Sequence, residues 1–113
     1  MVTPATQTVV LVRFPFSDLS ASKLRPAVVL ADAGRGDWVL CQITSSPYGD
    51  NAAVPVAETD FAAGSLQRAS FARPGKLFTA NAVLMAHEVG RLKPDKHRQI
   101  IGAVVALLEG RAP

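Results

Sequence analysis

The residues best suited to chemistry in this chain are an arginine at the start of one apolar run and two hydroxyl residues at the end of another. Arg25 precedes Pro26 and an apolar run that ends at Leu30. Proline pushes the residue before it toward an extended conformation, so the guanidinium of Arg25 should leave the strand in a defined direction. Arginine carries its donors in a rigid fork that suits phosphate oxygens. Together with Thr44 and Ser45, it predicts a site that holds a phosphodiester.

The elements that must position these residues are short β-strands. Runs of apolar, β-branched and aromatic residues, separated by turn signals such as residues 34–37 and 47–51, are typical of strands in a β-rich domain. Residues 17–23 are small and polar and should form a surface loop. The predicted strands cover residues 9–14, 26–31, 38–44, 53–57, 66–72 and 76–79, the last two separated by a break at Pro74 and Gly75.

Helical structure is expected mainly at the end of the chain. Pro94 and Asp95 suit a first helical turn, and Gly110 should end the helix. One apolar face at helical spacing comprises Ile100, Ile101, Val104, Val105 and Leu108. Residues 58–64 should form a turn or a short helical piece, and residues 81–85 a helical turn capped by Asn81. The fold class predicted is mainly β with α: a small SH3-like β-barrel with short helices and a C-terminal amphipathic helix.

The chain has 113 residues, of which 49% are hydrophobic and 19% charged. This length is enough for one hydrophobic core but not for two, so we expect a single domain over residues 1–113. No apolar run approaches the roughly twenty residues that cross a bilayer, and we expect no membrane partner. The first eight residues lack the pattern of a secretory signal. Cys41, the only cysteine, lies in a predicted strand and should be a small buried hydrophobe. We therefore expect a soluble cytoplasmic protein.

Charge is distributed unevenly along the chain. The formal net charge is +3; residues 67–76 contain three bases and no acid, residues 91–98 contain four bases and one acid, and residues 37–60 contain acids but no base. A domain with separate basic and acidic regions can present one face to a polyanion. Solubility is the favoured explanation of any single charge, so charge alone does not establish a nucleic-acid partner.

Several runs of the chain, in the same order, resemble the MazF/PemK family of toxin endoribonucleases. The similarity spans roughly residues 8 to 109, and its motifs become specific through their order. The runs are residues 9–20 (VVLVRFPFSDLS), 23–30 (KLRPAVVL), 42–45 (QITS), 70–79 (SFARPGKLFT) and 89–92 (VGRL) before the last helix.

This resemblance implies a CcdB-type barrel and the toxin component of a type II toxin–antitoxin system. The implied activity is metal-independent, sequence-specific cleavage of single-stranded RNA to 2′,3′-cyclic phosphate and 5′-hydroxyl ends, which inhibits translation and growth. The substrate would be mRNA, with tRNA or rRNA as alternatives. The implied partners are a second copy of the chain in a homodimer and a cognate antitoxin with a disordered acidic tail; promoter DNA would be bound only through that antitoxin.

The resemblance also assigns roles at the predicted phosphodiester site. Arg25 matches the catalytic arginine and Thr44 the residue that helps to hold the scissile phosphate, with Ser45 as a further helper. From its chemistry Arg25 is an electrostatic clamp for the transition state, because a guanidinium rarely gives up its proton. Without the resemblance, an ion-paired residue at the start of a strand is the favoured explanation of Arg25, and ordinary β-propensity is the alternative for Thr44.

One departure from the family concerns proton transfer. Relatives often carry an acid in the segment matched by residues 73–76, where this chain has Gly75. Asp18, in the loop before Arg25, is the nearest substitute in sequence, although it could also serve to fix that loop. The general base is therefore left unassigned.

RNA recognition should come from side chains on loops and strand edges around the site, because proteins read single-stranded RNA by stacking and edge contacts. No metal or cofactor is expected: His87 and His97 have no ligand spacing and are predicted to be surface histidines. The predicted RNA-binding residues are Phe16, Lys23, Tyr48, Asn51, Arg68 and Arg73.

Two other functions fit the same fold. A gyrase-poison toxin would act by binding protein through a hydrophobic C-terminal end with tryptophan, whereas the only tryptophan here is Trp38 and the chain ends in EGRAP. A barrel without catalytic activity could bind RNA or protein. Purified protein that binds RNA without cutting it would favour this last function.

Overall fold

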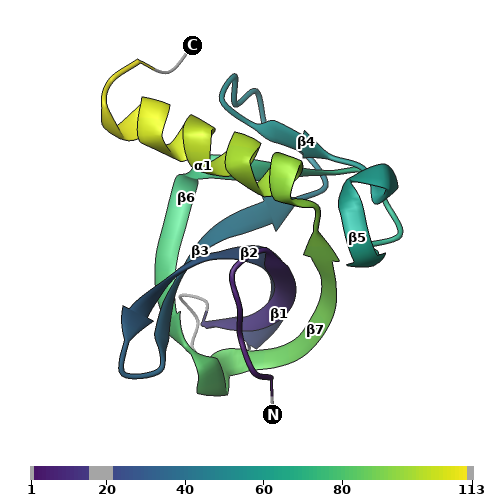
Figure 1. Ribbon diagram of the computed structural model, residues 1–113, viewed down its shortest axis with the longest axis vertical. Helices are drawn as coiled ribbons and strands as arrows, with labels where there is room; N and C mark the ends of the chain where they lie inside the picture. Colours follow the sequence, from purple (N-terminus) through teal and green to yellow (C-terminus); the bar gives the residue numbers. More distant parts are fainter. Residues whose placement is uncertain (1, 16–21, 112–113) are drawn as a thin grey trace.

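A computed structural model, which describes residues 2–15 and 22–111, shows one seven-stranded antiparallel sheet that curls into a half-barrel (Figure 1). The order across the sheet is β4-β6-β3-β2-β1-β7-β5. This arrangement confirms the predicted β-rich barrel class. The strands are β1 (Thr8–Pro15), β2 (Ser22–Gly34), β3 (Asp37–Thr44), β4 (Val54–Val56), β5 (Phe61–Gly64), β6 (Ser70–Asn81) and β7 (Met85–Leu92).

The central strands bury both of their faces. Val28 belongs to one apolar cluster and its neighbour Val29 to the other; Cys41 and Leu40 divide between the two clusters in the same way. Successive side chains of a strand point to opposite faces, so a strand covered on both sides must be apolar throughout. Full burial of one such Val or Leu side chain contributes about 1.5–3 kcal/mol. The continuous apolar runs in the sequence therefore build two clusters on one sheet.

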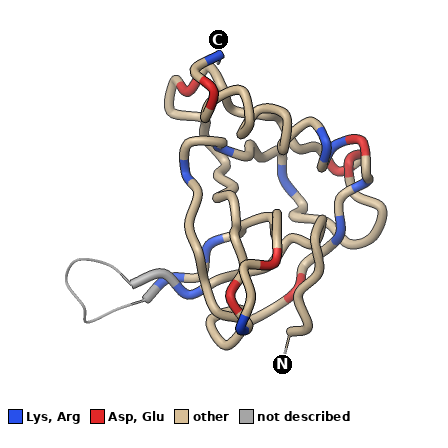
Figure 2. The backbone as a smooth tube through the Cα atoms, turned by 60° about the vertical axis from the view of Figure 1, so that its left-hand side comes forward, with Lys and Arg blue, Asp and Glu red and all other residues tan. Residues whose placement is uncertain are grey.

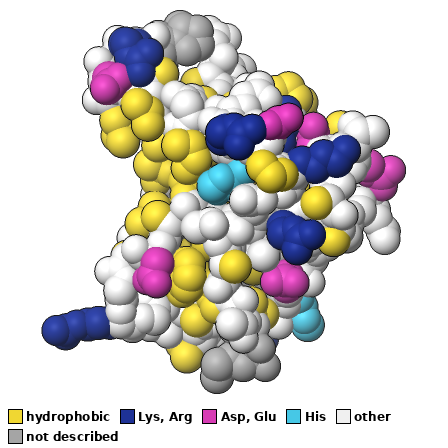
Figure 3. All heavy atoms as spheres, in the orientation of Figure 1, with side chains coloured by type: hydrophobic (Ala, Val, Ile, Leu, Met, Phe, Trp, Pro, Cys, Tyr) yellow, Lys and Arg dark blue, Asp and Glu magenta, His cyan; other side chains and the backbone are white. Residues whose placement is uncertain are grey.

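Helix α1 (Pro94–Leu108) lies across one end of the curled sheet and closes the first of these clusters (Figure 1). Ile100 and Val104 are buried in it, as the apolar spacing predicted. Val105 and Leu108 of the same stripe are exposed, and Figure 3 shows hydrophobic side chains gathered around this part of the molecular surface. The predicted stripe is thus wider than the face that the sheet covers.

The segment around Pro74 differs from the prediction. β6 continues through Pro74 and Gly75, where a break between two strands was expected. The register with β3 shifts here: Cys41 pairs with Leu77 and Ile43 with Ala72, so residues 73–76 bulge opposite a single residue of β3. A bulge removes the need for a ladder hydrogen bond from the proline nitrogen, which explains why the strand continues.

The segments around residues 58–64 and 85–92 also contain more β-structure than expected. Two short 3₁₀ helices, η1 (Glu58–Asp60) and η2 (Ala82–Leu84), precede β5 and β7. Asn81 caps η2 as predicted, since its side chain accepts a hydrogen bond from the backbone N–H of Val83 at 3.1 Å. Strand β7 was not predicted. At Gly90 it approaches β5 so closely that a Cβ would lie 2.7 Å from the carbonyl oxygen of Ala63, and only glycine fits there.

The basic and acidic regions of the sequence interleave in the fold. Figure 2 shows Lys and Arg positions next to Asp and Glu positions at the end of the molecule where α1 begins. Lys96 lies 3.7 Å from a carboxylate oxygen of Asp60 and donates to the carbonyl of Pro55 at 2.9 Å, while Arg98 pairs with Asp95. The basic stretch 91–98 is therefore partly neutralised in place by acids that lie elsewhere in the sequence or beside it on α1.

Cys41 and the histidines divide between confirmed and wrong predictions. Cys41 is fully buried and His87 is exposed, as expected. His97 on α1 is half-buried, and its Nε2 is enclosed with no hydrogen-bond partner among the described residues, so the prediction of a surface histidine is wrong there. It lies on α1 three residues before Ile100, which packs in the core, and is therefore close to the face that the helix turns to the sheet.

Candidate functional site

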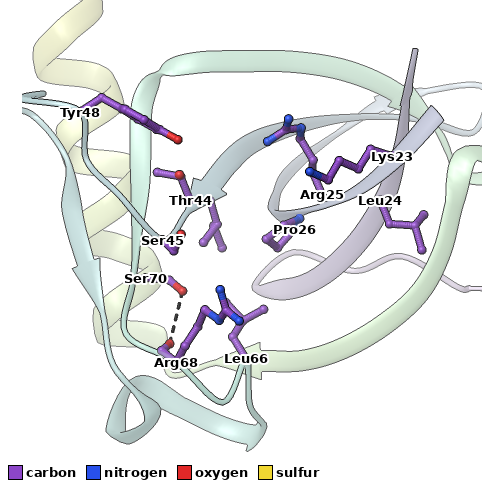
Figure 4. Close-up of a pocket in the computed structure, with 11 residues that line it drawn as sticks. Lys23, Leu24, Arg25, Pro26, Thr44, Ser45, Tyr48, Leu66, Arg68 and Ser70 are labelled. Atoms are coloured by element: carbon purple, nitrogen blue, oxygen red, sulfur yellow. Dashed lines mark hydrogen bonds between the residues drawn. The ribbon is translucent and has the colours of Figure 1, made fainter. Parts of the chain in front are cut away.

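A cavity of about 380 Å³ opens beside the ends of β2 and β3 (Figure 4). It takes residues from these strands, from the β3–β4 loop and from the segment between β5 and β6. Its described lining consists of Lys23, Leu24, Arg25, Pro26, Ile43, Thr44, Ser45, Tyr48, Leu66, Arg68 and Ser70.

The cavity opens where β2 and β3 stop pairing. The last pair of their register is Ala27 with Gln42, and the next residue of β2 is Pro26, which has no N–H to donate. β2 itself continues, because its pairing with β1 runs on through Arg25 opposite Val12. β2 therefore separates from β3 while it stays paired with β1. The cavity is the space between the separated ends of β2 and β3.

Arg25 and Thr44 face this space from the two strand ends. Each stands two positions beyond the last pair, Ala27 and Gln42, so the antiparallel register places them at equivalent positions. Figure 4 shows the guanidinium of Arg25 reaching toward the side of the cavity that carries Thr44 and Tyr48. The Thr44 hydroxyl accepts a hydrogen bond from the backbone N–H of Ser46 at 3.3 Å, which fixes the start of the loop.

The opposite wall adds a second guanidinium and a further hydroxyl. Arg68, in the segment before β6, is exposed and points into the cavity from below in Figure 4. Ser70 is buried at the start of β6 and donates to the carbonyl oxygen of Arg68 at 3.3 Å. This bond ties the Arg68 backbone to the sheet. Ser70 was missed as a site residue, although it is the first residue of the run 70–79 that resembles the toxin family.

The electrostatics of the cavity suit a polyanion. Lys23, Arg25 and Arg68 line it, and none of the described lining residues is acidic. The hydroxyls of Thr44 and Ser45 provide further donors. Guanidinium groups bind phosphate oxygens through paired hydrogen bonds, so this lining can hold a phosphodiester and stabilise added negative charge on it. The described lining contains no carboxylate or imidazole that could take a proton.

A half-buried ion pair supports the β3–β4 loop, which presents Tyr48 at the cavity. Arg73 of β6 donates from Nε to Oδ2 of Asp50 at 3.1 Å, and its guanidinium lies 5.6 Å from the centroid of the Tyr48 ring. The Arg73 hydrogen bond, supported by the backbone N–H of Ala52, holds the pKa of Asp50 below its usual value. Arg73 therefore contacts the loop that carries Tyr48 and is not among the described residues that line the cavity.

The remaining predicted site residues lie elsewhere. Asn51 is exposed in the β3–β4 loop and does not line the cavity, whereas Phe16 and Asp18 lie outside the described residues. A Cβ at Gly75 would lie 3.7 Å from Cδ2 of Leu107 on α1. That position faces the helix, so an acid there would not point into the cavity of this chain.

Two further kinds of feature, a cluster of metal ligands and a membrane-spanning helix, concern residues 2–15 and 22–111. Within these ranges no three His, Cys, Asp or Glu side chains gather as a metal site. None of the described helices is both long enough and apolar enough to span a bilayer.

Comparison with known proteins places the fold among the MazF toxins. No protein-family model and no curated protein sequence matches the chain. Among solved structures, the chain is similar to MazF in a MazE–MazF crystal structure from Deinococcus radiodurans, with 18% identity, a TM-score of 0.77 and coverage of 96% of this chain and 98% of that one.

Two mycobacterial structures show the same likeness. The Mycobacterium tuberculosis toxin MazF-mt6 has 18% identity and a TM-score of 0.69 over 90% of this chain and 96% of its own. An endoribonuclease in complex with its cognate antitoxin, from a mycobacterial species, has 16% identity and a TM-score of 0.73 over 98% of this chain and 100% of its own. The fold expected from the sequence resemblance is thereby confirmed.

Proposed function

We propose that this chain is the toxin of a type II toxin–antitoxin system and cleaves single-stranded RNA without a metal ion. The observation that carries the proposal is the cavity between the ends of β2 and β3, where Lys23, Arg25 and Arg68 converge with two hydroxyls and no described lining residue is acidic. Its position on a MazF-type fold supports the same assignment.

The reaction follows from what the lining can do to a phosphodiester. The 2′-oxygen of the ribose attacks the adjacent phosphorus and loses its proton, and the bond to the 5′-oxygen of the next nucleotide breaks. That 5′-oxygen gains a proton, so the products are a 2′,3′-cyclic phosphate and a 5′-hydroxyl. Negative charge builds up on the non-bridging oxygens during this step, and Arg25 stabilises it with a permanent charge. Thr44 and Ser45 hold the phosphate in line for attack.

The other two cations extend the site along the RNA chain. Lys23 and Arg68 are exposed and lie on β2 and before β6, on different walls of the cavity (Figure 4). Each can contact a phosphate next to the one that is cut. A single strand with unstacked bases fits such an open site, because its bases and phosphates can face different walls.

The proposal includes the partners that the resemblance implies. Two of the similar structures contain an antitoxin, named as MazE in one and as a cognate antitoxin in the other. An acidic, disordered antitoxin segment would fold over the cationic cavity of this chain and neutralise Arg25 and Arg68. We further assign a homodimer and a cytoplasmic location, as in the expectation from sequence.

The test uses purified protein and a long single-stranded RNA in the presence of EDTA. Wild-type protein should cut at a short recurring sequence and leave cyclic-phosphate ends, and Arg25→Ala should abolish the cuts. Lys76→Ala is the matched control, because Lys76 is an exposed cation of β6 that does not line the cavity. Cutting by Lys76→Ala but not by Arg25→Ala supports the proposal.

Intact RNA with folded wild-type protein would overturn the nuclease assignment. If the same protein still binds the RNA, a non-catalytic RNA-binding barrel takes its place. No observation favours the gyrase-poison alternative: Trp38 lies in β3 and packs against an apolar cluster, away from the C-terminal end.

A further inference from the structure

We propose that Tyr48 stacks on a nucleobase next to the phosphate held by Arg25, and that Arg73 is a positioning residue that holds the Tyr48 ring in place. This inference rests on the proposed function and explains why the site would select single-stranded RNA, whose bases are free to stack on Tyr48. It gives the ion pair of Arg73 and Asp50 a role that differs from the direct RNA contact predicted for Arg73.

The exposure of Tyr48 is the first observation. Its side chain lines the cavity and yet 73% of the residue is accessible, more than for any other aromatic residue among the described large hydrophobic ones. A tyrosine that served only to anchor its loop would be buried in one of the apolar clusters. Figure 4 shows the Tyr48 hydroxyl end reaching toward Arg25 across the cavity. An exposed ring beside a phosphate site is the usual arrangement for stacking an unpaired base.

The backbone of the loop is the second observation. Tyr48 has φ of +51°, in the left-handed region that a bulky side chain rarely adopts. Bonds centred on Asp50 maintain this conformation: its N–H donates to the carbonyl of Pro47 at 2.8 Å, and its Oδ1 accepts from the N–H of Ala52 at 2.9 Å. The loop thus holds Tyr48 in a strained backbone conformation that places its ring at the cavity, and such strain is typical of functional loops.

The position of Arg73 is the third observation. Its guanidinium lies 5.6 Å from the centroid of the Tyr48 ring, while its Nε is bound to Asp50. The side chains of Arg73 and Asp50 are only 20% and 18% exposed. The backbone carbonyl of Arg73 also accepts a hydrogen bond from the Cys41 thiol at 3.1 Å, so Arg73 is anchored in the sheet. A cation close to the ring restrains its orientation and leaves the rest of its surface for a base.

Charge then decides how the ligand is arranged. Asp50 neutralises Arg73, whereas Lys23, Arg25 and Arg68 are the charged residues of the described cavity lining. The phosphates therefore go to the cavity, and the base goes to the Tyr48 ring at its mouth. A single strand can meet both requirements because its bases are free to leave the stack.

The binding test uses an oligonucleotide pool of random sequence with 2′-O-methyl riboses, which cannot attack their own phosphates. Binding is then measured separately from cleavage. Tyr48→Ala should weaken binding by about five- to a hundredfold, the range expected for loss of one stacked base. Tyr48→Phe keeps the ring and should bind as wild type does. Equal affinities of wild-type protein and Tyr48→Ala would overturn the inference.

A double-mutant cycle tests the role of Arg73. Arg73→Gln should weaken binding in the wild-type background and have little further effect in the Tyr48→Ala background, because it acts through the ring. Asp50→Asn should behave in the same way. Equal losses in both backgrounds would mean that Arg73 contacts RNA directly, and the positioning role would be wrong. Thermal melting of each variant shows that it is folded before its affinity is compared.

Crosslinking identifies the contact itself. A pool with 5-iodouracil at one fixed position, irradiated with the protein, should attach to the peptide that contains Tyr48, and the crosslink should be absent in Tyr48→Ala. A crosslink only to other peptides would overturn the inference. If wild-type protein binds the pool through Tyr48 and yet cuts no RNA, the stacking role stands and the nuclease assignment fails. If it cuts RNA without contact to Tyr48, the reverse holds.

Discussion

Arg25 of β2 and Thr44 of β3 stand at equivalent positions of one antiparallel strand pair, each two residues beyond its last bridge between Ala27 and Gln42. Pro26 ends that ladder by lacking an N–H, and β1 keeps β2 in the sheet through the pair of Arg25 with Val12. The same short segment thus separates the two strands and aims a guanidinium into the space between them. The segment around Pro26 therefore accounts both for the cavity and for the position of the Arg25 guanidinium in it.

Replacement of Arg25 by lysine tests whether the fork or the charge matters. Lysine keeps the positive charge but binds one oxygen as a point charge, so stabilisation of the transition state should fall. We expect the cleavage rate of Arg25→Lys to drop about a hundredfold or more, the usual cost of losing one such donor to a developing oxyanion. Single-turnover rates on a short RNA that contains the cut site measure the effect; an unchanged rate would reduce Arg25 to a simple counter-charge.

The salt dependence of RNA binding should report the cations at the cavity. Each phosphate neutralised on a single strand contributes about 0.7 to the slope of log K against log salt. Lys23→Ala should therefore lower that slope by roughly this amount and weaken binding at every sequence alike. Titrations of an uncleavable oligonucleotide at several salt concentrations measure it. The same slope in Lys76→Ala as in wild type serves as the control.

His97 should make the fold less stable in mildly acidic solution. Burial lowers the pKa of His97 from its usual 6.5, and the nearby Val29 backbone opposes this with a smaller effect. Below about pH 6.5 the unfolded chain binds a proton at His97 more readily than the folded chain does. The contribution of His97 to the free energy of unfolding is therefore fully present above about pH 6.5 and is lost as the pH falls toward the pKa of the folded state. Urea denaturation at pH 7.5 and 5.5 should show this loss.

The matched histidine variants separate this effect from general acid sensitivity. His97→Gln removes the titrating group, so its loss of stability between the two pH values should be smaller than that of wild type. His87→Gln changes the exposed histidine of β7 and should behave as wild type. Equal pH dependence in all three proteins would contradict a role for His97.

Cys41 should be unreactive in the folded protein. Burial raises the pKa of its thiol to about 12, and its Sγ donates to the carbonyl oxygen of Arg73 at 3.1 Å. Since the thiolate is the nucleophile, a thiol reagent at pH 8 should label native protein very slowly and denatured protein at once. Fast labelling of the native chain would show that β3 and β6 open readily at this point, beside the loop that holds Tyr48.

Several features of the site could be predicted because they depend on local chemistry. Pro26 predicts the extended conformation of Arg25, and hydroxyls at the end of an apolar run predict donors at a strand end. Both Arg25 and Thr44 line the cavity, as do Ser45, Lys23, Tyr48 and Arg68. Their roles in catalysis and RNA binding remain predictions.

Other features depend on register and could not be read from order along the chain. Pro74 ends a strand by every local rule, yet β6 passes through it because a bulge opposite β3 removes the need for its N–H. β7 was not predicted because a glycine and polar residues interrupt its apolar pattern. Gly90 is needed there because β7 approaches β5 too closely for any larger residue. Arg73 looked like a rim cation until the fold placed Asp50 beside it.

By itself, the sequence determined the fold class, the two-sided burial of the central strands, the terminal helix and the pair of strand ends that carry Arg25 and Thr44. These follow from side-chain periodicity and from the backbone limits of proline, which act over a few residues. The tertiary structure alone decided which cations meet in one cavity, that Asp50 neutralises Arg73, and that Tyr48 stands exposed at the cavity mouth. Those outcomes depend on strand register and loop closure, which bring together residues more than twenty positions apart.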